Sequence, residues 1–258
     1  MSISPIGFFD SGIGGVSVWK EVTKLLPDEN TIYYADSKNS PYGSKSISEI
    51  QNISIKNSNW LVDKGCKLIV VACNTATTNA ISLLRKKFPI PFVGIEPGIK
   101  PAVKKSKKGK IGVLATKGTL SSKLFEKTTK SIDKNNFDII ESHGDGIVEI
   151  IESGDFENDK LKSILIEYLK PMIDYGIDQL VLGCTHYFII QDLIKKIIGN
   201  NIIINNYNVA VASQVERILL KEKIVNSEKN EIYNDFYSNG NNFALEKLLG
   251  KTNSVIKI

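Results

Sequence analysis

The sequence predicts an α/β protein of two similar open parallel-sheet lobes, with a ligand site in the cleft between them. Short apolar runs alternate with stretches of helical periodicity along most of the 258 residues. This pattern is typical of parallel sheets built from βαβ units. The rhythm restarts near Lys110, so the second half repeats the order of the first. We expect a first lobe of residues 1–96 plus 206–258 and a second lobe of residues 97–205.

Glycine and proline residues separate the elements expected in the first lobe. An apolar strand over 6–9 runs into the glycine-rich turn 10–15, and a helix then continues until Pro27. A polar loop over 37–46 separates the second strand from the second helix. The remaining elements alternate in the same way, with strands at 31–35, 67–73 and 92–95 and helices at 47–61 and 75–88.

The second lobe and the tail continue the alternation. A helix opens at 118–121, after the first strand of this lobe. The other elements expected in the lobe are strands at 111–116, 139–142 and 179–184 and helices at 147–152, 161–175 and 189–198. The tail is expected to form a helix at 209–220, a strand at 231–237, a helix at 243–249 and a short apolar segment at 255–256.

The composition is that of an ordinary globular protein, with 42% hydrophobic and 24% charged residues. No apolar run approaches the roughly 20 residues that span a bilayer, and the first residues lack the features of a secretory signal. Three cysteines is a low, odd count, which argues against a disulfide framework and favours a reducing compartment. We therefore expect a cytoplasmic protein with no membrane partner.

The net charge of +5 raises the question of nucleic-acid binding. A basic run supports it, made of Lys104, Lys105, Lys107, Lys108 and Lys110. No aromatic residues interleave with this run, as a single-strand binder would need. We interpret the run as a solvated helix end and expect no nucleic-acid partner.

Two strands end in a cysteine that polar side chains follow at once. Asn74 and Thr75 follow Cys73, and a threonine and a histidine at 185–186 follow Cys184. Open α/β sheets bind ligands at the carboxyl ends of their strands. A buried cysteine needs no function, but packing alone does not require these polar followers. The pair therefore predicts a pocket with one thiol on each wall.

A metal site is the rival interpretation of the same residues. Cys73, Cys184 and His186 could be three ligands, although the close C-x-x-C pairs of structural zinc sites are absent. We expect no metal. Cys66 lacks the polar followers, and we interpret it as structural.

The turn over 10–15 reads Asp-Ser-Gly-Ile-Gly-Gly. It could cradle a small anion such as a carboxylate at a helix N-terminus, or it could be a tight turn that merely needs glycine. It matches neither the dinucleotide fingerprint nor a P-loop. Asp10, at a strand end, is well placed to hold an ammonium group.

Together these motifs resemble the signature set of bacterial glutamate racemases, in the cofactor-independent Asp/Glu racemase family. Related aspartate racemases carry a different glycine turn and usually a glutamate where His186 stands. Phe188 departs from the family, which commonly has proline there, and the segment 142–146 is less typical. The motifs that carry the resemblance are Asp10-Ser11-Gly12 with Gly14-Gly15, Pro41-Tyr42-Gly43, Cys73-Asn74-Thr75-Ala76 and Gly183-Cys184-Thr185-His186-Tyr187.

The resemblance implies an isomerase that interconverts L-glutamate and D-glutamate without a cofactor. D-Glutamate would feed peptidoglycan synthesis, and so cell-wall biogenesis and cell shape. By the same resemblance, Cys73 and Cys184 are the two catalytic acid/base groups and Glu152 is a helper carboxylate. Beside them, His186 would favour the thiolate of Cys184, and Asp10 would accept a proton or hold the substrate ammonium.

Donors to the substrate carboxylates are expected from the same motifs. They are Ser11, Tyr42, Gly43, Asn74, Thr75, Thr185 and His186, with Thr116 and Thr119 as weaker candidates. No lysine stands in a recognisable site motif, so no pyridoxal phosphate is expected. Two alternatives remain open: an aspartate or hydantoin racemase, and a non-catalytic amino-acid-binding protein on the same fold. A homodimer is compatible with the sequence, which does not fix the oligomeric state.

Overall fold

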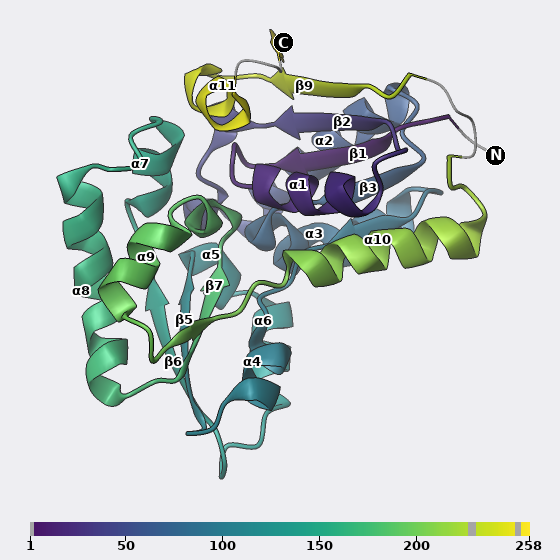
Figure 1. The fold of residues 1–258 in the computed structure, drawn as a ribbon. Helices are drawn as coiled ribbons and strands as arrows, with labels where there is room; N and C mark the ends of the chain where they lie inside the picture. The colour runs from purple at the N-terminus through teal and green to yellow at the C-terminus, as the bar shows by residue number, and fades with distance from the viewer. Residues whose placement is uncertain (1–2, 227–230, 251–253) are drawn as a thin grey trace.

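The computed structural model of the chain describes residues 3–226, 231–250 and 254–258. Its strands form two parallel sheets (Figure 1). The first sheet has the order β10-β9-β2-β1-β3-β4, and the second has the order β6-β5-β7-β8. The predicted α/β fold with two parallel-sheet lobes is therefore confirmed. No helix in the described part of the chain is long and apolar enough to cross a membrane.

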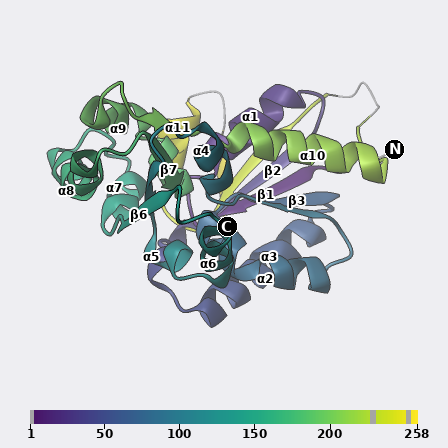
Figure 2. The same cartoon turned by 90° about the horizontal axis from the view of Figure 1, so that it is seen from below.

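The first sheet is covered by helices on both faces. α1 (Val16–Leu25) and α10 (Asn208–Glu222) pack together on one face, while α2 (Ile47–Asp63) and α3 (Asn74–Lys87) cover the other (Figure 2). Strands that are buried on both faces have continuous apolar sequences, and the central strands of this sheet have such sequences. The strands are β1 (Ile6–Asp10), β2 (Thr31–Ala35), β3 (Leu68–Val71), β4 (Phe92–Gly94), β9 (Asn234–Ser238) and β10 (Val255–Lys257).

The second sheet is smaller and is also covered on both faces. α8 (Asp159–Tyr175) and α9 (Gln191–Ile198) lie on one face, and α4 (Ile99–Lys105) and α6 (Lys123–Lys130) lie on the other (Figure 1). Its strands are β5 (Lys110–Ala115), β6 (Asp138–His143), β7 (Gln179–Gly183) and β8 (Ile203–Ile204). Three short helices complete the fold, namely α5 (Lys117–Leu120), α7 (Ile147–Glu152) and α11 (Phe243–Leu249).

Each sheet reverses its winding direction at one strand. The first sheet has β2 and β3 on opposite sides of β1, and the second has β6 and β7 on opposite sides of β5. Such a switch point opens a crevice at the carboxyl ends of the strands, where α/β proteins bind ligands. Asp10 ends β1, and Cys184 directly follows β7. The topology therefore places predicted site residues at both crevices.

Element boundaries differ from the predicted ones for local reasons. The strand predicted over 67–73 ends at Val71, because Cys73 is already the N-cap of α3. α4 ends at Lys105, within the run that was interpreted as a solvated helix end, whereas its start at Ile99 and the two-residue β8 were not predicted. Pro101 lies in the first turn of α4, where a missing backbone N–H costs little. All strands of the second sheet lie between residues 97 and 205, and the strands of the first sheet lie outside this range. We therefore propose that the lobes divide at these two residues, as predicted.

Candidate active site

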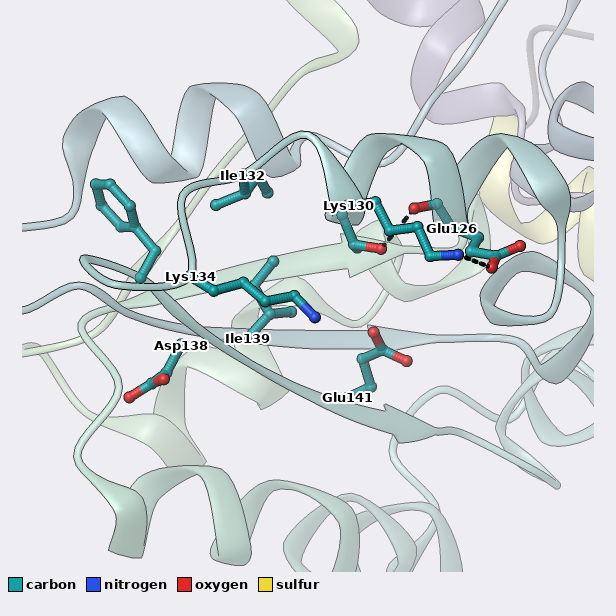
Figure 3. Close-up of a pocket in the computed structure, with 9 residues that line it drawn as sticks. Glu126, Lys130, Ile132, Lys134, Asp138, Ile139 and Glu141 are labelled. Carbon is teal, nitrogen blue, oxygen red and sulfur yellow. Dashed lines mark hydrogen bonds and ion pairs between the residues drawn. The ribbon is translucent and has the colours of Figure 1, made fainter.

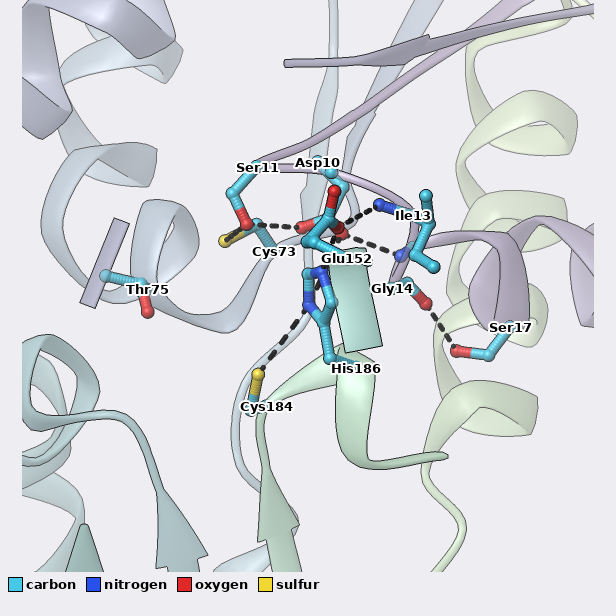
Figure 4. Close-up of polar contacts among 12 residues, drawn as sticks. Asp10, Ser11, Ile13, Gly14, Ser17, Cys73, Thr75, Glu152, Cys184 and His186 are labelled. Carbon is cyan, nitrogen blue, oxygen red and sulfur yellow. Dashed lines mark hydrogen bonds and ion pairs between the residues drawn. The ribbon is translucent and has the colours of Figure 1, made fainter. Parts of the chain in front are cut away.

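The two cysteines stand at the carboxyl ends of strands in different lobes, and both are buried. The sulfur of Cys73 accepts the backbone N–H of Ala76 at 3.5 Å, which caps α3. The same thiol donates to the Ser11 hydroxyl at 3.8 Å, and that hydroxyl donates to Asp10 Oδ1 at 3.5 Å. A chain of polar groups thus connects the Cys73 thiol to the Asp10 carboxyl (Figure 4).

The second thiol has an imidazole as its neighbour. His186 Nδ1 lies 3.8 Å from Cys184 Sγ and 4.0 Å from Asp10 Oδ2. On the other side of the ring, His186 Nε2 lies 2.6 Å from Glu152 Oε1. Glu152 Oε1 also accepts the backbone N–H of Ile13 at 2.8 Å (Figure 4). His186 and Glu152 of the second lobe are thereby joined to the glycine turn of the first.

The glycine turn allows this close approach between the lobes. A Cβ atom on Gly12 would lie 1.9 Å from Glu152 Oε1, and one on Gly14 would lie 2.4 Å from His186 Nδ1. Side chains at these positions would push the lobes apart. Asp10 closes the turn from the inside, since its Oδ2 accepts the backbone N–H of Gly15 at 2.8 Å. The turn is glycine-rich because the His186–Glu152 pair packs directly on its backbone.

Burial sets the protonation of the Cys73 side of the site. Burial raises the pKa of the Cys73 thiol well above its ordinary value, and the charge of Asp10 adds to the rise. Burial also raises the pKa of Asp10, against the opposing effect of the His186 charge. At neutral pH, Cys73 is therefore a protonated thiol that can give a proton.

On the other side of the site, the surroundings of His186 favour a charged group. Burial disfavours the charged ring, but hydrogen bonds with Cys184 and Glu152 outweigh it. The charges of Glu152 and Asp10 act in the same direction, and together these groups raise the pKa of His186 well above its usual value. The ring is therefore an imidazolium at neutral pH, and an imidazolium beside a sulfur favours the thiolate. The two thiols therefore have different charged neighbours, the Asp10 carboxyl beside Cys73 and the His186 ring beside Cys184.

Three threonine hydroxyls form a closed ring where the lobes meet. Thr75 Oγ1 lies 2.7 Å from Thr116 Oγ1 and 3.1 Å from Thr119 Oγ1. Thr116 Oγ1 donates to Thr119 Oγ1 at 3.0 Å, which completes the ring. Thr75 belongs to the first lobe and the other two to the second. Hydroxyls that satisfy one another in this way can turn toward a carboxylate when one enters.

Two predicted donors have their side chains engaged elsewhere. The Tyr42 hydroxyl donates to Asp36, inside the first lobe. Asn74 Nδ2 donates to the carbonyl of Ile95 at 3.1 Å. What these positions offer a ligand is therefore the backbone at 42–43 and the buried Asn74 amide oxygen, which accepts no hydrogen bond from the residues that the structure describes.

Two further predicted residues, Ser11 and Thr185, are buried, and Cys66 lies away from them. Ser11 and Thr185 are at most 5% exposed. Cys66 packs in the core of the first lobe, where burial raises the pKa of its thiol to about 12. No titratable partner is among the causes of that rise, which agrees with a structural role.

Comparison with known proteins identifies the family. The family model described as Asp/Glu/Hydantoin racemase matches residues 13–212, most of the chain. The chain belongs to this family. Glutamate racemase of Cupriavidus pinatubonensis is 43% identical over 221 residues, which are 86% of this chain and 81% of that protein.

Solved structures of family members show the same fold over nearly the whole length. Glutamate racemase isoform RacE1 from Bacillus anthracis matches with a TM-score of 0.86 at 31% identity, covering 99% of this chain and 97% of that one. Glutamate racemase from Francisella tularensis, crystallised in complex with D-glutamate, matches with a TM-score of 0.85 at 28% identity and covers 100% and 98%.

One residue that supports the racemase-family site gave no signal in the sequence. The Tyr33 hydroxyl donates to the Gly12 carbonyl at 2.9 Å, and this hydrogen bond stabilises the glycine turn. Tyr33 lies in β2 and is fully buried, so its sequence context is that of any core strand. Only the register of β2 beside β1 brings its hydroxyl under the turn.

A separate cavity of about 350 Å³ lies on the surface of the second lobe, between α6 and β6 (Figure 3). It contains no thiol. Lys130 and Glu126 form an exposed ion pair at its edge, and burial raises the pKa of Glu141 within it. Among the residues that the structure describes, no cluster of His, Cys, Asp and Glu has the arrangement of a metal site. These features do not point to a second catalytic centre.

The raised pKa of His186 predicts how stability depends on pH. A group whose pKa is raised by folding stabilises the fold fully below its unfolded pKa, here about 6.5, and loses this effect as pH rises through the folded pKa. His186→Gln should therefore lower the free energy of unfolding by about 3 kcal/mol at pH 6. The difference from wild type should shrink as pH rises toward 10, as measured by urea unfolding.

The control is His143→Gln, at the chain's other histidine, which is exposed and paired with Asp145. This variant should stay within about 0.5 kcal/mol of wild type over the same pH range. A His186→Gln difference that grows as pH rises would contradict the buried imidazolium.

Proposed function

We propose that the chain is a glutamate racemase, which interconverts L-glutamate and D-glutamate by proton transfer between Cα and two cysteines. The observation that carries the proposal is the pairing of the thiols. Cys73 lies with Ser11 and Asp10 on one lobe, and Cys184 lies with His186 on the other. A thiol and a thiolate on opposite sides of a bound amino acid are what inversion at Cα requires.

The reaction follows from these protonation states. The Cys184 thiolate removes the Cα proton from one enantiomer and becomes a thiol. Cys73 then gives its proton to the opposite face of Cα and becomes a thiolate. The other enantiomer runs the same steps in reverse. Between turnovers in one direction, the Cys184 thiol releases its proton to water, which the positive charge of His186 favours, and the Cys73 thiolate regains a proton through Ser11 and the Asp10 carboxyl.

The other predicted residues have supporting roles in this proposal. Glu152 orients His186 and helps keep it charged. Ser11, Thr75, Thr185 and the backbone at 42–43 supply donors to the substrate carboxylates. Asn74 offers its amide oxygen as an acceptor, because its amide nitrogen donates to Ile95. No cofactor enters the scheme, because both proton transfers are assigned to side chains of the chain.

Two observations favour glutamate racemisation over the alternatives. The relatives described above are named glutamate racemases, and one of them was crystallised with D-glutamate. A non-catalytic binding protein would need the carboxylate donors but would have no use for an imidazolium placed beside a thiol. In a cell, the D-glutamate would supply peptidoglycan synthesis, in the cytoplasm.

A homodimer stays a prediction from the sequence. Sedimentation velocity of the purified protein tests it, with and without glutamate. A single species at the 28.6 kDa of one chain under both conditions would contradict it.

The substrate is tested by circular dichroism of the purified, chelator-treated protein. The signal of L-glutamate should decay to zero as the D-enantiomer accumulates, and the signal of L-aspartate should stay nearly constant. Faster decay with L-aspartate would overturn the assignment to glutamate. No decay with either substrate would favour a binding protein or a hydantoin racemase.

The two-thiol mechanism is tested by replacing each cysteine with serine, whose hydroxyl is a far weaker acid and a poorer base. Cys73→Ser and Cys184→Ser should each lose racemisation by about 10²-fold or more while keeping the wild-type melting temperature. Elimination from a glutamate analogue with a β-leaving group needs proton abstraction alone. It should survive in both variants with opposite enantiomer preference, and equal loss for both enantiomers would contradict opposed thiols.

A further inference from the structure

Asp36 is a buried carboxylate that the proposed mechanism does not use. It follows β2 directly and is fully buried. Its backbone N–H donates to the carbonyl of Asp10 at 3.0 Å, so it stands one strand away from the catalytic carboxyl. A carboxylate buried this deeply is costly unless its oxygens are satisfied by donors.

Four side chains donate to the two oxygens of Asp36. Asn39 Nδ2 donates to Oδ1 at 2.8 Å, and Asn239 Nδ2 donates to the same atom. The Tyr42 hydroxyl donates to Oδ2, and Asn57 Nδ2 lies 3.3 Å from that oxygen. Asn57 Nδ2 also donates to the Tyr42 oxygen at 3.0 Å. One carboxylate thus joins the loop after β2, the helix α2 and the segment after β9.

In this arrangement, only a carboxylate can accept hydrogen bonds at both of its terminal atoms. An amide at position 36 would keep one acceptor oxygen and place an N–H₂ donor against the other pair of donors. If its nitrogen faced Tyr42, the buried hydroxyl of Tyr42 would lose its acceptor. A buried donor without an acceptor costs more than the hydrogen bond itself contributes.

The loop that Asp36 holds lies against the second lobe. Residues Tyr42–Ser44 form a short 3₁₀ turn, and Gly43 packs against Thr116 of the other lobe. A Cβ atom on Gly43 would lie 2.8 Å from Thr116 Cβ. Thr116 belongs to the hydroxyl ring with Thr75. The position of the turn therefore determines how closely the backbone at Gly43 approaches the ring.

We propose that Asp36 is a positioning residue for substrate binding, which fixes the turn at 42–44 against the threonine ring. This inference rests on the proposed function, because the ring and the turn are taken as donors to a substrate carboxylate. Asp36 contacts neither thiol through any hydrogen bond among the described residues, so its effect reaches the substrate through Tyr42 and Gly43. Loss of the carboxylate should weaken binding more than it slows proton transfer.

The test compares Asp36→Asn with wild type. KM for glutamate should rise about 10-fold, while kcat changes less than about 3-fold. Because the two enantiomers have equal free energies in water, kcat/KM should fall by the same factor in both directions. The control is Asp63→Asn, which makes the same charge change at the exposed end of α2 in the same lobe and should leave both constants unchanged.

A second variant and a second readout keep the test decisive if Asp36→Asn folds poorly. Tyr42→Phe removes only the hydroxyl that joins Asp36 to the turn, and it should raise KM in the same direction by a smaller factor. Hydrogen exchange without substrate reports the turn itself, through the Lys45 amide that donates to the Tyr42 carbonyl at 3.1 Å. Exchange at Lys45 should speed up about 10-fold in Asp36→Asn and in Tyr42→Phe.

The outcomes separate this inference from the proposed function. Absence of glutamate racemisation in the wild type would overturn the proposed function, while the Lys45 exchange would still test whether Asp36 holds the turn. An unchanged KM in folded Asp36→Asn, or a fall in kcat alone, would overturn the positioning role. Unchanged Lys45 exchange in both variants would overturn it as well.

Discussion

The buried ring of His186 is the interaction on which the rest of the site depends. It lies between Glu152 and Asp10, carboxylates of different lobes, and only 1% of its side chain is exposed. Without a positive charge between them, two carboxylates this close in a buried site would repel. The ring therefore holds the lobes together and faces the Cys184 sulfur with the same charge. The glycines at 12 and 14 are a consequence, because a side chain at position 12 would collide with Glu152 and one at position 14 would collide with the ring.

The two lobes repeat a topology but differ in chemistry. Each sheet has a switch point, and each lobe contributes one cysteine beyond the end of a strand. Cys73 is connected through Ser11 to a carboxyl group, whereas Cys184 is next to an imidazolium. A symmetrical pair of thiols in equal surroundings would rest in the same protonation state. The surroundings here are unequal, since burial and the Asp10 charge keep Cys73 protonated while Cys184 faces a positive ring. A reaction that moves a proton across Cα needs such a difference between its two groups.

Features of the fold and the site that depend on residues close together in the sequence could be predicted. The alternation of elements gave the parallel sheets, and the polar residues after Cys73 and Cys184 marked two strand ends. The role of Asp36 depends on Asn239, some 200 residues away, and could not be read from its own neighbours. Tyr42 was predicted to supply a donor to the substrate, but its hydroxyl lies inside the first lobe, where it donates to Asp36. Contacts between distant loops decide such details, and a single sequence does not show which loops meet.

The central claim is that two groups on opposite sides of Cα exchange protons with the substrate. It is tested most directly by letting the wild-type protein act on L-glutamate in deuterium oxide and analysing the first few per cent of reaction by mass spectrometry. A two-base site predicts that the D-glutamate formed carries deuterium at Cα, while the remaining L-glutamate keeps its hydrogen. D-Glutamate that retains the original hydrogen, or early deuterium in the unreacted L-glutamate, would show a single base working on both faces and would contradict the account.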